Sequence, residues 1–511
     1  MTASLPESHV YPLRTAEATA RTGAAGRTRI ASHLRALFGD LDASAILAIE
    51  QDVGWVHLPS GKELFRQGER ADGAYIVANG RLRVVASTEC GERILDEVGP
   101  GQWIGEMALL TQSERSATVY AVRDTELVWV PQVAFEGLIR RHPQAMLETA
   151  RRLASRLAQQ IGSESRPQSD MRTLAVVPAN HSVCAHPFTT ALAAALTRYG
   201  SVLHLTAERV DQLLGEPGIA NAREDESAHL RLARWLIECE AKYRFVIYEG
   251  DPEWSGWTDR VVRNADRIMV LAAGQSSPED GETRRHLSDR FSKSRAPKRT
   301  LVLLQPAERD VFPGTARWLD AWPVDEHFHV RYGLSNDVER VARILTGNAV
   351  CLVFGGGASR GYAHIGVLRA FEELGIPIDA VGGTSMGAAV AAGAALGLSS
   401  SKVMTACAQI ARRAFDLTLP VVSIAAGKGQ MDGIVGVAGD LDIEDLRTTF
   451  FCVSTNLTRA EEVVHRRGKI ATAVRASMAV PGLFPPVPHN GDLLVDGGLS
   501  NNVPVDTMAS L

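Results

Sequence analysis

The pattern of apolar and polar positions divides the chain into regions of different periodicity. Residues 28–53 have a helical period, the next stretch to Val130 consists of short β runs between regularly spaced glycines, and a helical period returns over residues 132–162. This rhythm predicts a small β-roll with flanking helices at residues 28–162. Residues 1–27 are predicted to form a disordered polar tail, and residues 163–171 a linker.

From residue 172 onward, apolar runs alternate with helical segments. LAVVP, FVIYEG and TLVLLQP are examples of the apolar runs, which continue to residue 345. The alternation predicts a doubly wound α/β domain with a mostly parallel sheet at residues 172–345. The strand AVCLVF then begins another α/β domain, at residues 349–511. The predicted fold class is therefore multidomain: a β-roll, a doubly wound α/β domain and a C-terminal α/β domain.

Composition and charge narrow the class of protein. The chain has 54 Lys and Arg against 59 Asp and Glu, so its net charge is 54 − 59 = −5, which argues against a dedicated nucleic-acid binder. The six cysteines lie far apart with no C-x-x-C pair, so we expect a reduced, cytoplasmic chain without a metal site. No apolar signal segment opens the sequence. The uncharged run from Ala380 up to Lys402 consists mainly of small residues, and we expect a buried turn and helix there.

Two glycine-rich turns mark the C-terminal region. GGGASRG, from Gly355 to Gly361, follows a predicted strand and precedes a predicted helix. The backbone N–H groups of such a turn favour a dinucleotide phosphate or the oxyanion of acyl transfer, and Asp379 lies near the spacing of a ribose-binding acid. The second turn, Gly383 to Gly387, is a G-x-S-x-G between a short strand and an Ala-rich helix, a context that exposes a nucleophilic serine and favours acyl transfer.

The nucleophile Ser385 needs a base, and the chain order limits the choice. An α/β-hydrolase has the order Ser, acid, His, yet no histidine follows Asp496 in LLVDGG. Three earlier histidines remain open as bases in another order: His364, His465 and His489. The simplest alternative is a dyad in which Asp496 takes the serine proton directly. By itself, D-G-G between an apolar run and Asn-Asn favours a simple hairpin turn.

Taken together, GGGASRG, GTSMG and DGG, with RASMAVPGLFPPV before the last, resemble the patatin-like phospholipases. DLTLPVVSI and FFCVSTNLTRAEEVVHRRGKI resemble the neuropathy target esterase branch of that family. The resemblance implies Ser385 as nucleophile, Asp496 as base and no catalytic cofactor. It further implies an oxyanion hole at Gly355, Gly356, Gly357 and Arg360, and an elbow at Gly383 and Gly387. Family members usually continue beyond the point where this chain stops, so we expect a truncated chain or a minimal member.

A second set of candidate residues lies in the segment from Gly101 to Val122. Glu106 can accept a hydrogen bond from a ribose hydroxyl and Arg115 can fork onto a phosphate, although both also fit the surface of a β-roll. The segment resembles the phosphate-binding cassette of cyclic-nucleotide-binding domains, and the glycine rhythm matches over most of residues 30–160. The resemblance implies a cassette for cAMP or cGMP made of Gly105, Glu106, Met107, Ala108, Arg115, Ser116 and Ala117. Glu114 stands where the family commonly has proline, and we expect it to compete for the guanidinium of Arg115.

The region 172–345 has strands but no G-x-x-x-x-G-K-[ST]. AVVPANHSVCAHPFTT has the position of a P-loop without its glycines and lysine, so we interpret the domain as a degenerate P-loop-like scaffold. The domain also resembles the segment that precedes the patatin unit in neuropathy-target-esterase-like proteins, which favours a scaffold. Two segments are candidate contacts with a membrane surface: the basic segment Arg284 to Thr300 and the apolar segment AVPGLFPPV.

The favoured hypothesis is a cytoplasmic serine acyl hydrolase that releases fatty acids from phospholipids or lysophospholipids, peripheral at the inner membrane surface and regulated by cAMP or cGMP. One alternative is a cyclic-nucleotide-responsive scaffold with an inactive patatin unit. Another is a dinucleotide enzyme built on GGGASRG, which would bind a nicotinamide cofactor.

Overall fold

The computed structural model describes residues 53–88, 91–141, 171–223, 227–278, 281–290 and 297–510. The predicted tail, most of the predicted linker and part of the basic segment lie outside the described residues. Two compact units divide the chain, the first comprising residues 1–270 and 280–299 and the second residues 271–279 and 300–511.

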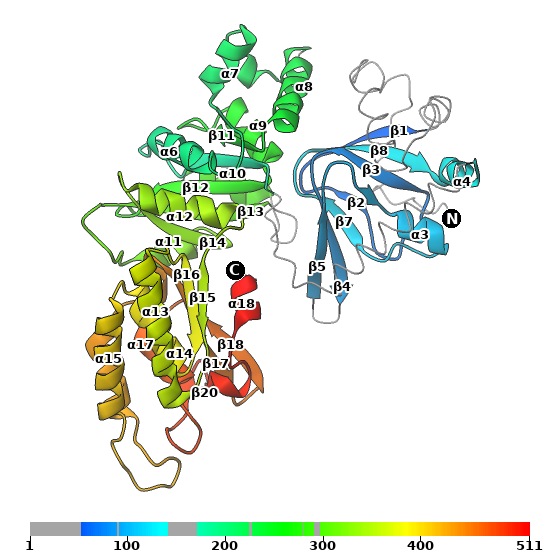
Figure 1. The fold of residues 1–511 in the computed structure, drawn as a ribbon. Helices are drawn as coiled ribbons and strands as arrows, with labels where there is room; N and C mark the ends of the chain where they lie inside the picture. Colours follow the sequence, from blue (N-terminus) through cyan, green and yellow to red (C-terminus); the bar gives the residue numbers. More distant parts are fainter. Residues whose placement is uncertain are drawn as a thin grey trace. The chain divides into compact units, whose positions relative to one another are not determined.

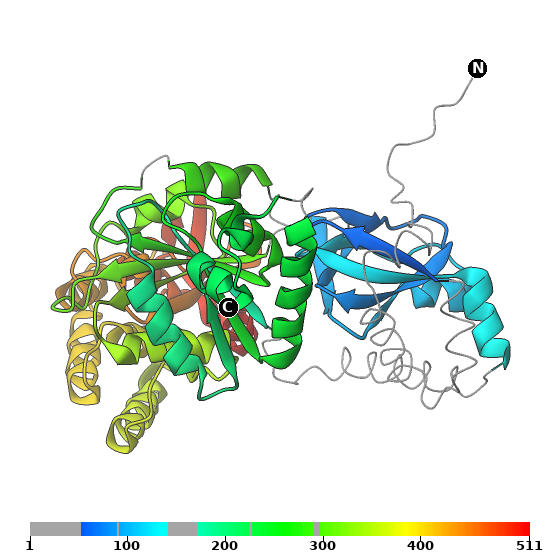
Figure 2. The same cartoon turned by 90° about the horizontal axis from the view of Figure 1, so that it is seen from above.

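The first unit contains the predicted β-roll, coloured blue to cyan in Figures 1 and 2. Its two antiparallel four-stranded sheets have the orders β1-β8-β3-β6 and β2-β7-β4-β5. Burial alternates along β1, as expected for a strand with one face toward a core. The apolar faces enclose a core that includes Val56, Leu58, Val77, Leu82 and Leu127. The elements are β1 (Gly54–Leu58), β2 (Glu63–Phe65), β3 (Gly73–Asn79), β4 (Leu82–Thr88), β5 (Gly91–Val98), β6 (Trp103–Ile104), α3 (Glu106–Thr111), β7 (Thr118–Ala121), β8 (Thr125–Pro131) and α4 (Gln132–Arg141).

The same unit continues with parallel strands in the order β10-β11-β9. All six residues of β9 are buried, which is typical of a parallel strand covered on both faces. The strands alternate with helices, as predicted. The elements are β9 (Thr173–Pro178), α6 (His186–Leu196), β10 (Val202–Leu205), α7 (Ala207–Leu214), η1 (Ile219–Asn221), α8 (Ser227–Lys242), β11 (Phe245–Glu249), α9 (Gly256–Asn264), β12 (Arg267–Ala273) and α10 (Glu282–Arg290).

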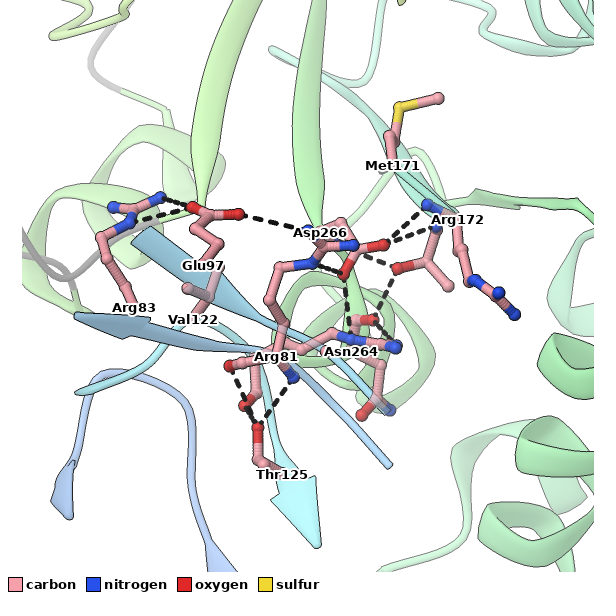
Figure 3. Close-up of polar contacts among 12 residues, drawn as sticks. Arg81, Arg83, Glu97, Val122, Thr125, Met171, Arg172, Asn264 and Asp266 are labelled. Atoms are coloured by element: carbon pink, nitrogen blue, oxygen red, sulfur yellow. Dashed lines mark hydrogen bonds and ion pairs between the residues drawn. The ribbon is translucent and has the colours of Figure 1, made fainter. Parts of the chain in front are cut away.

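A buried ionic network joins the β-roll to these α/β elements inside the first unit (Figure 3). The carboxylate of Asp266, just before β12, lies 3.2 Å from Nε of Arg81 and 3.0 Å from Nε of Arg123. Its other oxygen accepts the backbone N–H groups of Arg172 and Thr173. Burial disfavours its charge, yet the two arginines and the two amides hold the pKa of Asp266 below its usual value.

The second unit contains the parallel pair β13 and β14 and the predicted C-terminal α/β domain. The sheet of this C-terminal domain has the order β15-β16-β17-β20-β19, with β18 also paired to β17. β15, β16 and β17 are parallel, whereas β18 and β20 run antiparallel to β17. The elements are β13 (Lys298–Gln305), α11 (Thr315–Ala321), β14 (Glu326–Arg331), α12 (Ser335–Leu345), β15 (Cys351–Phe354), η2 (Ala358–Gly361), α13 (Tyr362–Leu374), β16 (Ala380–Thr384), α14 (Met386–Ala395), α15 (Ser400–Arg413), α16 (Lys428–Ala438), η3 (Ile443–Asp445), β17 (Thr449–Asn456), β18 (Glu461–His465), α17 (Ile470–Ser477), β19 (Val487–His489), β20 (Asp492–Asp496), η4 (Gly497–Leu499) and α18 (Val505–Ala509).

The uncharged run that begins at Ala380 folds as predicted, into β16 and the buried helix α14. α14 packs on β15, β16 and β17, and its small side chains allow this close approach. Among the described residues, no helix is long and apolar enough to cross a bilayer.

Candidate active site

Ser385 lies at a sharp turn between β16 and α14. Its backbone has φ 56° and ψ −123°, a conformation that residues with a side chain rarely adopt. The turn reverses the chain at the end of a parallel strand, where an exposed Oγ can meet a substrate. This is the conformation expected of a nucleophile elbow, and a strained serine in it indicates a functional constraint.

The two glycines of the elbow are required by close backbone packing. A Cβ on Gly383 would lie 2.6 Å from the carbonyl oxygen of Phe354 and 2.6 Å from the backbone of Gly387. A Cβ on Gly387 would collide with the same carbonyl of Phe354. The predicted roles of Gly383 and Gly387 therefore have a steric reason, because the turn brings α14 directly against β15.

Asp496 lies at the end of β20, opposite Ser454 of β17 in an antiparallel register. This pairing brings its carboxylate to Ser385, whose Oγ donates a 2.7 Å hydrogen bond to Oδ2 of Asp496. The second oxygen, Oδ1, accepts the backbone N–H of Gly498 at 2.8 Å. The D-G-G sequence thus both turns the chain and orients the carboxylate toward the serine, so the two interpretations of this motif are compatible.

The electrostatics of Asp496 suit a general base. Burial raises the pKa of its carboxyl, while the hydrogen bonds from Ser385 and Gly498 partly counter that effect. A carboxylate that is less well solvated than a free aspartate is a stronger proton acceptor. The 2.7 Å contact gives it direct access to the proton that Ser385 must lose.

The three histidines left open by the sequence have other hydrogen-bond partners. Nε2 of His364 bonds to the carbonyl of Gly355, and Nε2 of His465 bonds to Ser454. Burial lowers the pKa of His465 to about 4. The ring of His489 lies 5.9 Å from that of His465, on β19. Among the described residues, the hydrogen bond from Oγ of Ser385 to a possible base goes to Asp496.

Asp379 is occupied by a structural ion pair. Its buried carboxylate receives Nε and Nη2 of Arg343 at 2.9 and 2.7 Å, and the backbone N–H of Val350 at 2.9 Å. These contacts tie α12 to the start of β15 and β16. Because they occupy the carboxylate, Asp379 is not placed to hold a ribose, which removes the spacing argument for a dinucleotide site at GGGASRG.

The glycine-rich loop lies beside the serine. A Cβ on Gly356 would approach Cβ of Ser385 at 3.2 Å, so glycine is needed for this approach. The N–H of Gly356 donates to the carbonyl of Asn502 at 3.1 Å, which makes Gly356 a spacer in this conformation rather than a free donor. Gly355, Gly357 and Arg360 stay predictions as oxyanion ligands.

Sequence reasoning missed a polar residue that supports the elbow from α17. Oγ of Ser477 accepts the backbone N–H of Ser385 at 2.9 Å and donates to the carbonyl of Val453 at 2.6 Å. This relay holds the strained turn against β17. The only signal was its position in RASMAVPG, which precedes the aspartate motif and carries no catalytic pattern of its own.

The candidate cassette of the β-roll is formed around α3. Gly105 adopts φ 84° immediately before the helix, and Glu106 is buried at its first position. Arg115 is also buried, and its guanidinium lies 4.1 Å from the centre of the Phe65 ring. The remaining predicted residues flank these: Met107 and Ser116 are exposed, and Ala108 and Ala117 are buried.

Arg115 is held by protein acceptors at the floor of the cassette. Nη1 donates to the carbonyl of Gly105 at 2.9 Å, and Nη2 donates to the carbonyl of Gly73 at 2.8 Å and approaches Asp72 at 3.3 Å. Burial lowers the pKa of Arg115, and Tyr75 and Asp72 partly offset the effect. We expected competition from Glu114, but the carboxylate that pairs with Arg115 comes from Asp72.

Three family models match successive parts of the chain. They are a cyclic nucleotide-binding domain over residues 55–142, a neuropathy target esterase family P-loop-like domain over 170–346, and a patatin-like phospholipase over 352–509. In its domains, the chain matches the neuropathy target esterase type of patatin-like phospholipase. The predicted order of domains is therefore confirmed, including the match of the middle region to a P-loop-like domain.

Curated relatives match almost the whole chain. Patatin-like phospholipase domain-containing protein 7 of Rattus norvegicus is 33% identical over 92% of this chain and 38% of its own length. Neuropathy target esterase sws of Drosophila melanogaster is 34% identical over 89% of this chain and 35% of its own. Lysophospholipase NTE1 of Pyricularia oryzae is 33% identical over 91% and 36%, respectively. The chain thus spans little more than a third of the length of these relatives.

The patatin domain carries all of the Ser385 and Asp496 geometry described above, because both residues lie within 352–509. Likewise, Glu106 and Arg115 fall within the cyclic nucleotide-binding domain. The two candidate sites of the neuropathy-target-esterase-type chain therefore belong to separate domains, each with its own packed core.

Proposed function

We propose that this chain is a serine acyl hydrolase that releases fatty acids from phospholipids or lysophospholipids, acting at the cytoplasmic surface of a membrane under control of a cyclic nucleotide. The observation that supports the chemistry best is the 2.7 Å hydrogen bond from Ser385 to Asp496 at a strained elbow. The relatives named above, called phospholipases or a lysophospholipase, support the class of substrate.

The mechanism uses two half-reactions. Oγ of Ser385 attacks the ester carbonyl while Asp496 takes its proton, and N–H groups of the glycine-rich loop stabilise the oxyanion. Collapse of the tetrahedral intermediate expels the alcohol, which leaves with the proton from Asp496, and the acyl group stays on Ser385. Water then attacks the acyl ester, Asp496 accepts its proton and returns it to Ser385, and the fatty acid is released.

An exposed apolar loop supports contact with lipid. In residues 415–424, called the apolar loop below, Leu419 is 82% and Val421 89% exposed. Four more large apolar side chains of the loop are at least half exposed: Phe415, Leu417, Val422 and Ile424. So many exposed apolar groups in ten residues are unusual on a protein surface and typical of a surface that meets another apolar phase.

The apolar loop is fixed to the backbone that leads to the base. N–H groups of Ile424 and Ala425 donate to the carbonyls of Gly482 and Leu483, and the N–H of Asp496 donates to the carbonyl of Ala479. Within AVPGLFPPV, Phe484 is buried against Ala414 and Ala425. Lipid contact through the apolar loop would thus bring acyl chains toward the dyad.

Membrane contact through the basic segment stays a prediction. Arg299 is buried in β13, and part of the segment lies outside the described residues.

Fatty-acid release from lysophosphatidylcholine vesicles by the wild-type chain and by Ser385→Ala tests the activity. We expect release that is lost in the variant. A folded wild-type chain that releases no fatty acid, or equal release by Ser385→Ala, would contradict the proposal and favour a scaffold with an inactive patatin domain.

The apolar loop is tested with the double variant L419D/V421D on vesicles and on a short-chain, monomeric ester. We expect release from vesicles to fall at least tenfold while hydrolysis of the soluble ester is retained. The matched control is Leu374→Asp, because Leu374 is 72% exposed but lies at the end of α13, about 20 Å along the helix from its start beside the glycine-rich loop. Equal losses in the control would contradict a specific lipid contact.

A further inference from the structure

The α/β elements of the first unit bring together two imidazoles and a carboxylate that belong to neither candidate site. His204 lies on β10, Glu249 is the last residue of β11, and His186 is the first residue of α6. β10 and β11 are adjacent and parallel, so their carboxyl ends lie at the same edge of the sheet, where open α/β sheets bind ligands.

The three side chains converge on one point. Nε2 of His204 lies 2.7 Å and Nδ1 of His186 3.2 Å from the same oxygen, Oε2 of Glu249. One ligand atom from each residue falls within 4.8 Å of the other two. Around a zinc ion with bonds of about 2.0–2.2 Å, tetrahedral ligand atoms are separated by about 3.3 Å. The two nitrogen-to-oxygen separations thus need to change by only fractions of an ångström to reach this value, and the two imidazole nitrogens lie within 4.8 Å of each other.

The donor set is chemically suited to a divalent transition metal. Two imidazole nitrogens and one carboxylate oxygen are ligands that Zn²⁺ accepts, and three protein ligands leave a coordination position open to water. The side chain of His186 is 63% exposed, whereas those of His204 and Glu249 are each 11% exposed. An ion could therefore enter from the His186 side and be held by the two ligands on the strands.

A second group of contacts fixes the carboxylate. Oγ1 of Thr189, one turn into α6, donates to Oε2 of Glu249 at 2.5 Å. The indole Nε1 of Trp257 donates to the backbone carbonyl of Glu249 at 2.8 Å. Supporting hydrogen bonds of this kind orient the ligands of metal sites.

We propose that His186, His204 and Glu249 form a binding site for one divalent transition-metal ion, with Zn²⁺ as the best fit. The ion would link the start of α6 to the ends of β10 and β11. The loop before α6 has the position of a P-loop without its glycines and lysine, and it leads into His186 at the start of the helix. A metal site here would give the degenerate P-loop-like domain a ligand of its own. This inference does not depend on the proposed hydrolase activity.

Sequence spacing gave no indication of the site. The two histidines are 18 residues apart (204 − 186), and Glu249 follows His204 by 45 residues, so no short metal-binding motif is present. From the sequence we expected no metal, because the cysteines show no zinc-binding spacing. The three residues of the cluster come together only through the fold of α6, β10 and β11.

Co²⁺ binding to the full chain tests the proposal, because this ion gives a visible absorption spectrum in sites that Zn²⁺ occupies. After treatment with a chelator, we expect one equivalent of Co²⁺ to produce the spectrum and one equivalent of Zn²⁺ to abolish it. His186→Ala is the main variant, since an exposed side chain can be removed with little effect on folding. We expect its affinity for Co²⁺ to fall at least tenfold.

His181→Ala is the matched control, an exposed histidine five residues earlier that lies outside the cluster. It should bind Co²⁺ like the wild type. A second measurement, thermal unfolding with and without Zn²⁺, should show a metal-dependent rise in Tm for the wild type and His181→Ala and a reduced rise for His186→Ala. Failure of the wild type to bind Co²⁺, or unchanged binding by His186→Ala, would overturn the site and leave a hydrogen-bonded cluster of structural value only.

Discussion

The catalytic dyad and the nucleotide cassette differ in how their charged groups are directed. At the dyad, Asp496 points at Ser385, and both of its carboxylate oxygens accept hydrogen bonds. At the cassette, Arg115 points into the protein and bonds to two backbone carbonyls and Asp72. The first site is arranged for reaction without rearrangement, whereas the second must exchange protein acceptors for a ligand phosphate.

This difference matches the role proposed for each site, because a catalyst and a sensor need different degrees of preorganisation. A dyad gains rate from preorganisation, because no reorientation is required during the reaction. A sensor gains from a site whose ligand replaces an internal partner, because the replacement gives bound and free forms different contacts. Among the internal acceptors of Arg115, the carbonyls belong to the fold, and the exposed side chain of Asp72 is the one that can move away.

The largest expected effect is loss of the base. Asp496→Asn keeps the size of the side chain but removes the proton acceptor, so we expect kcat to fall by about 10³–10⁴-fold with a smaller change in KM. Steady-state kinetics on a soluble ester measure both values.

The double variant S385A/D496N sharpens this prediction. If the two residues act as one unit, it should be no slower than Ser385→Ala alone. If the two losses in kcat multiply in the double variant, Asp496 works independently of the serine. The site would then not be the preorganised dyad that the comparison assumes.

The next effect concerns the steric basis of the elbow. Gly387→Ala would place a methyl group against the carbonyl of Phe354, and the buried helix α14 has little freedom to retreat. We expect a loss of about 2–4 kcal/mol in the free energy of unfolding of the patatin domain, measured by denaturant titration.

Gly436→Ala is the control for this substitution. Gly436 lies inside helix α16, and a Cβ there would meet open space. Its replacement should be neutral or slightly stabilising, because alanine is the better helix former. Equal effects of the two substitutions would show that the elbow tolerates a side chain.

The pH dependence follows from the burial of Asp496. Its pKa is raised, so the carboxylate that acts as base forms only as the pH rises above the ordinary range of aspartate. We expect the acidic limb of the kcat profile to lie at a higher pH than the ordinary pKa of an aspartate. The sign for stability is opposite: the folded state binds this proton more tightly than the unfolded state, so this group's stabilising contribution is present at low pH and lost as the pH rises through the raised pKa.

Asp496→Asn checks the assignment of this limb. The acidic limb should disappear from its residual activity, and its unfolding free energy should no longer carry this loss with rising pH. An unchanged limb in the variant would assign the titration to another group.

The sequence was sufficient wherever one local motif determines one local geometry. G-x-S-x-G predicted the turn at Ser385 because the close approach of Gly383 and Gly387 requires glycine. The β-roll and the alternating α/β region were likewise predicted from periodicity and confirmed by the domain matches.

The sequence was insufficient wherever the geometry depends on pairing between distant segments. Ser477 reaches Ser385 across 92 residues, and Asp72 reaches Arg115 across 43. In the second case we assigned the competing acid to Glu114, its neighbour in sequence. Proximity along the chain was a poor guide because Glu114 is exposed, while the loop before β3 brings Asp72 to the guanidinium.

The smallest expected effect concerns the nucleotide cassette and the ion pair between Arg115 and Asp72. Asp72→Asn removes the charge that pairs with Arg115, and the side chain of Asp72 is 67% exposed, so the pair contributes at most about 1 kcal/mol. We expect cAMP or cGMP to bind up to about fivefold more tightly, measured by calorimetry on the full chain. Glu114→Gln is the matched control, because it removes a neighbouring charge without touching the observed pair, and its affinity should stay close to that of the wild type. A larger gain from Glu114→Gln than from Asp72→Asn would mean that Arg115 turns toward Glu114 when the nucleotide binds, and that the cassette rearranges more than its phosphate contact alone requires.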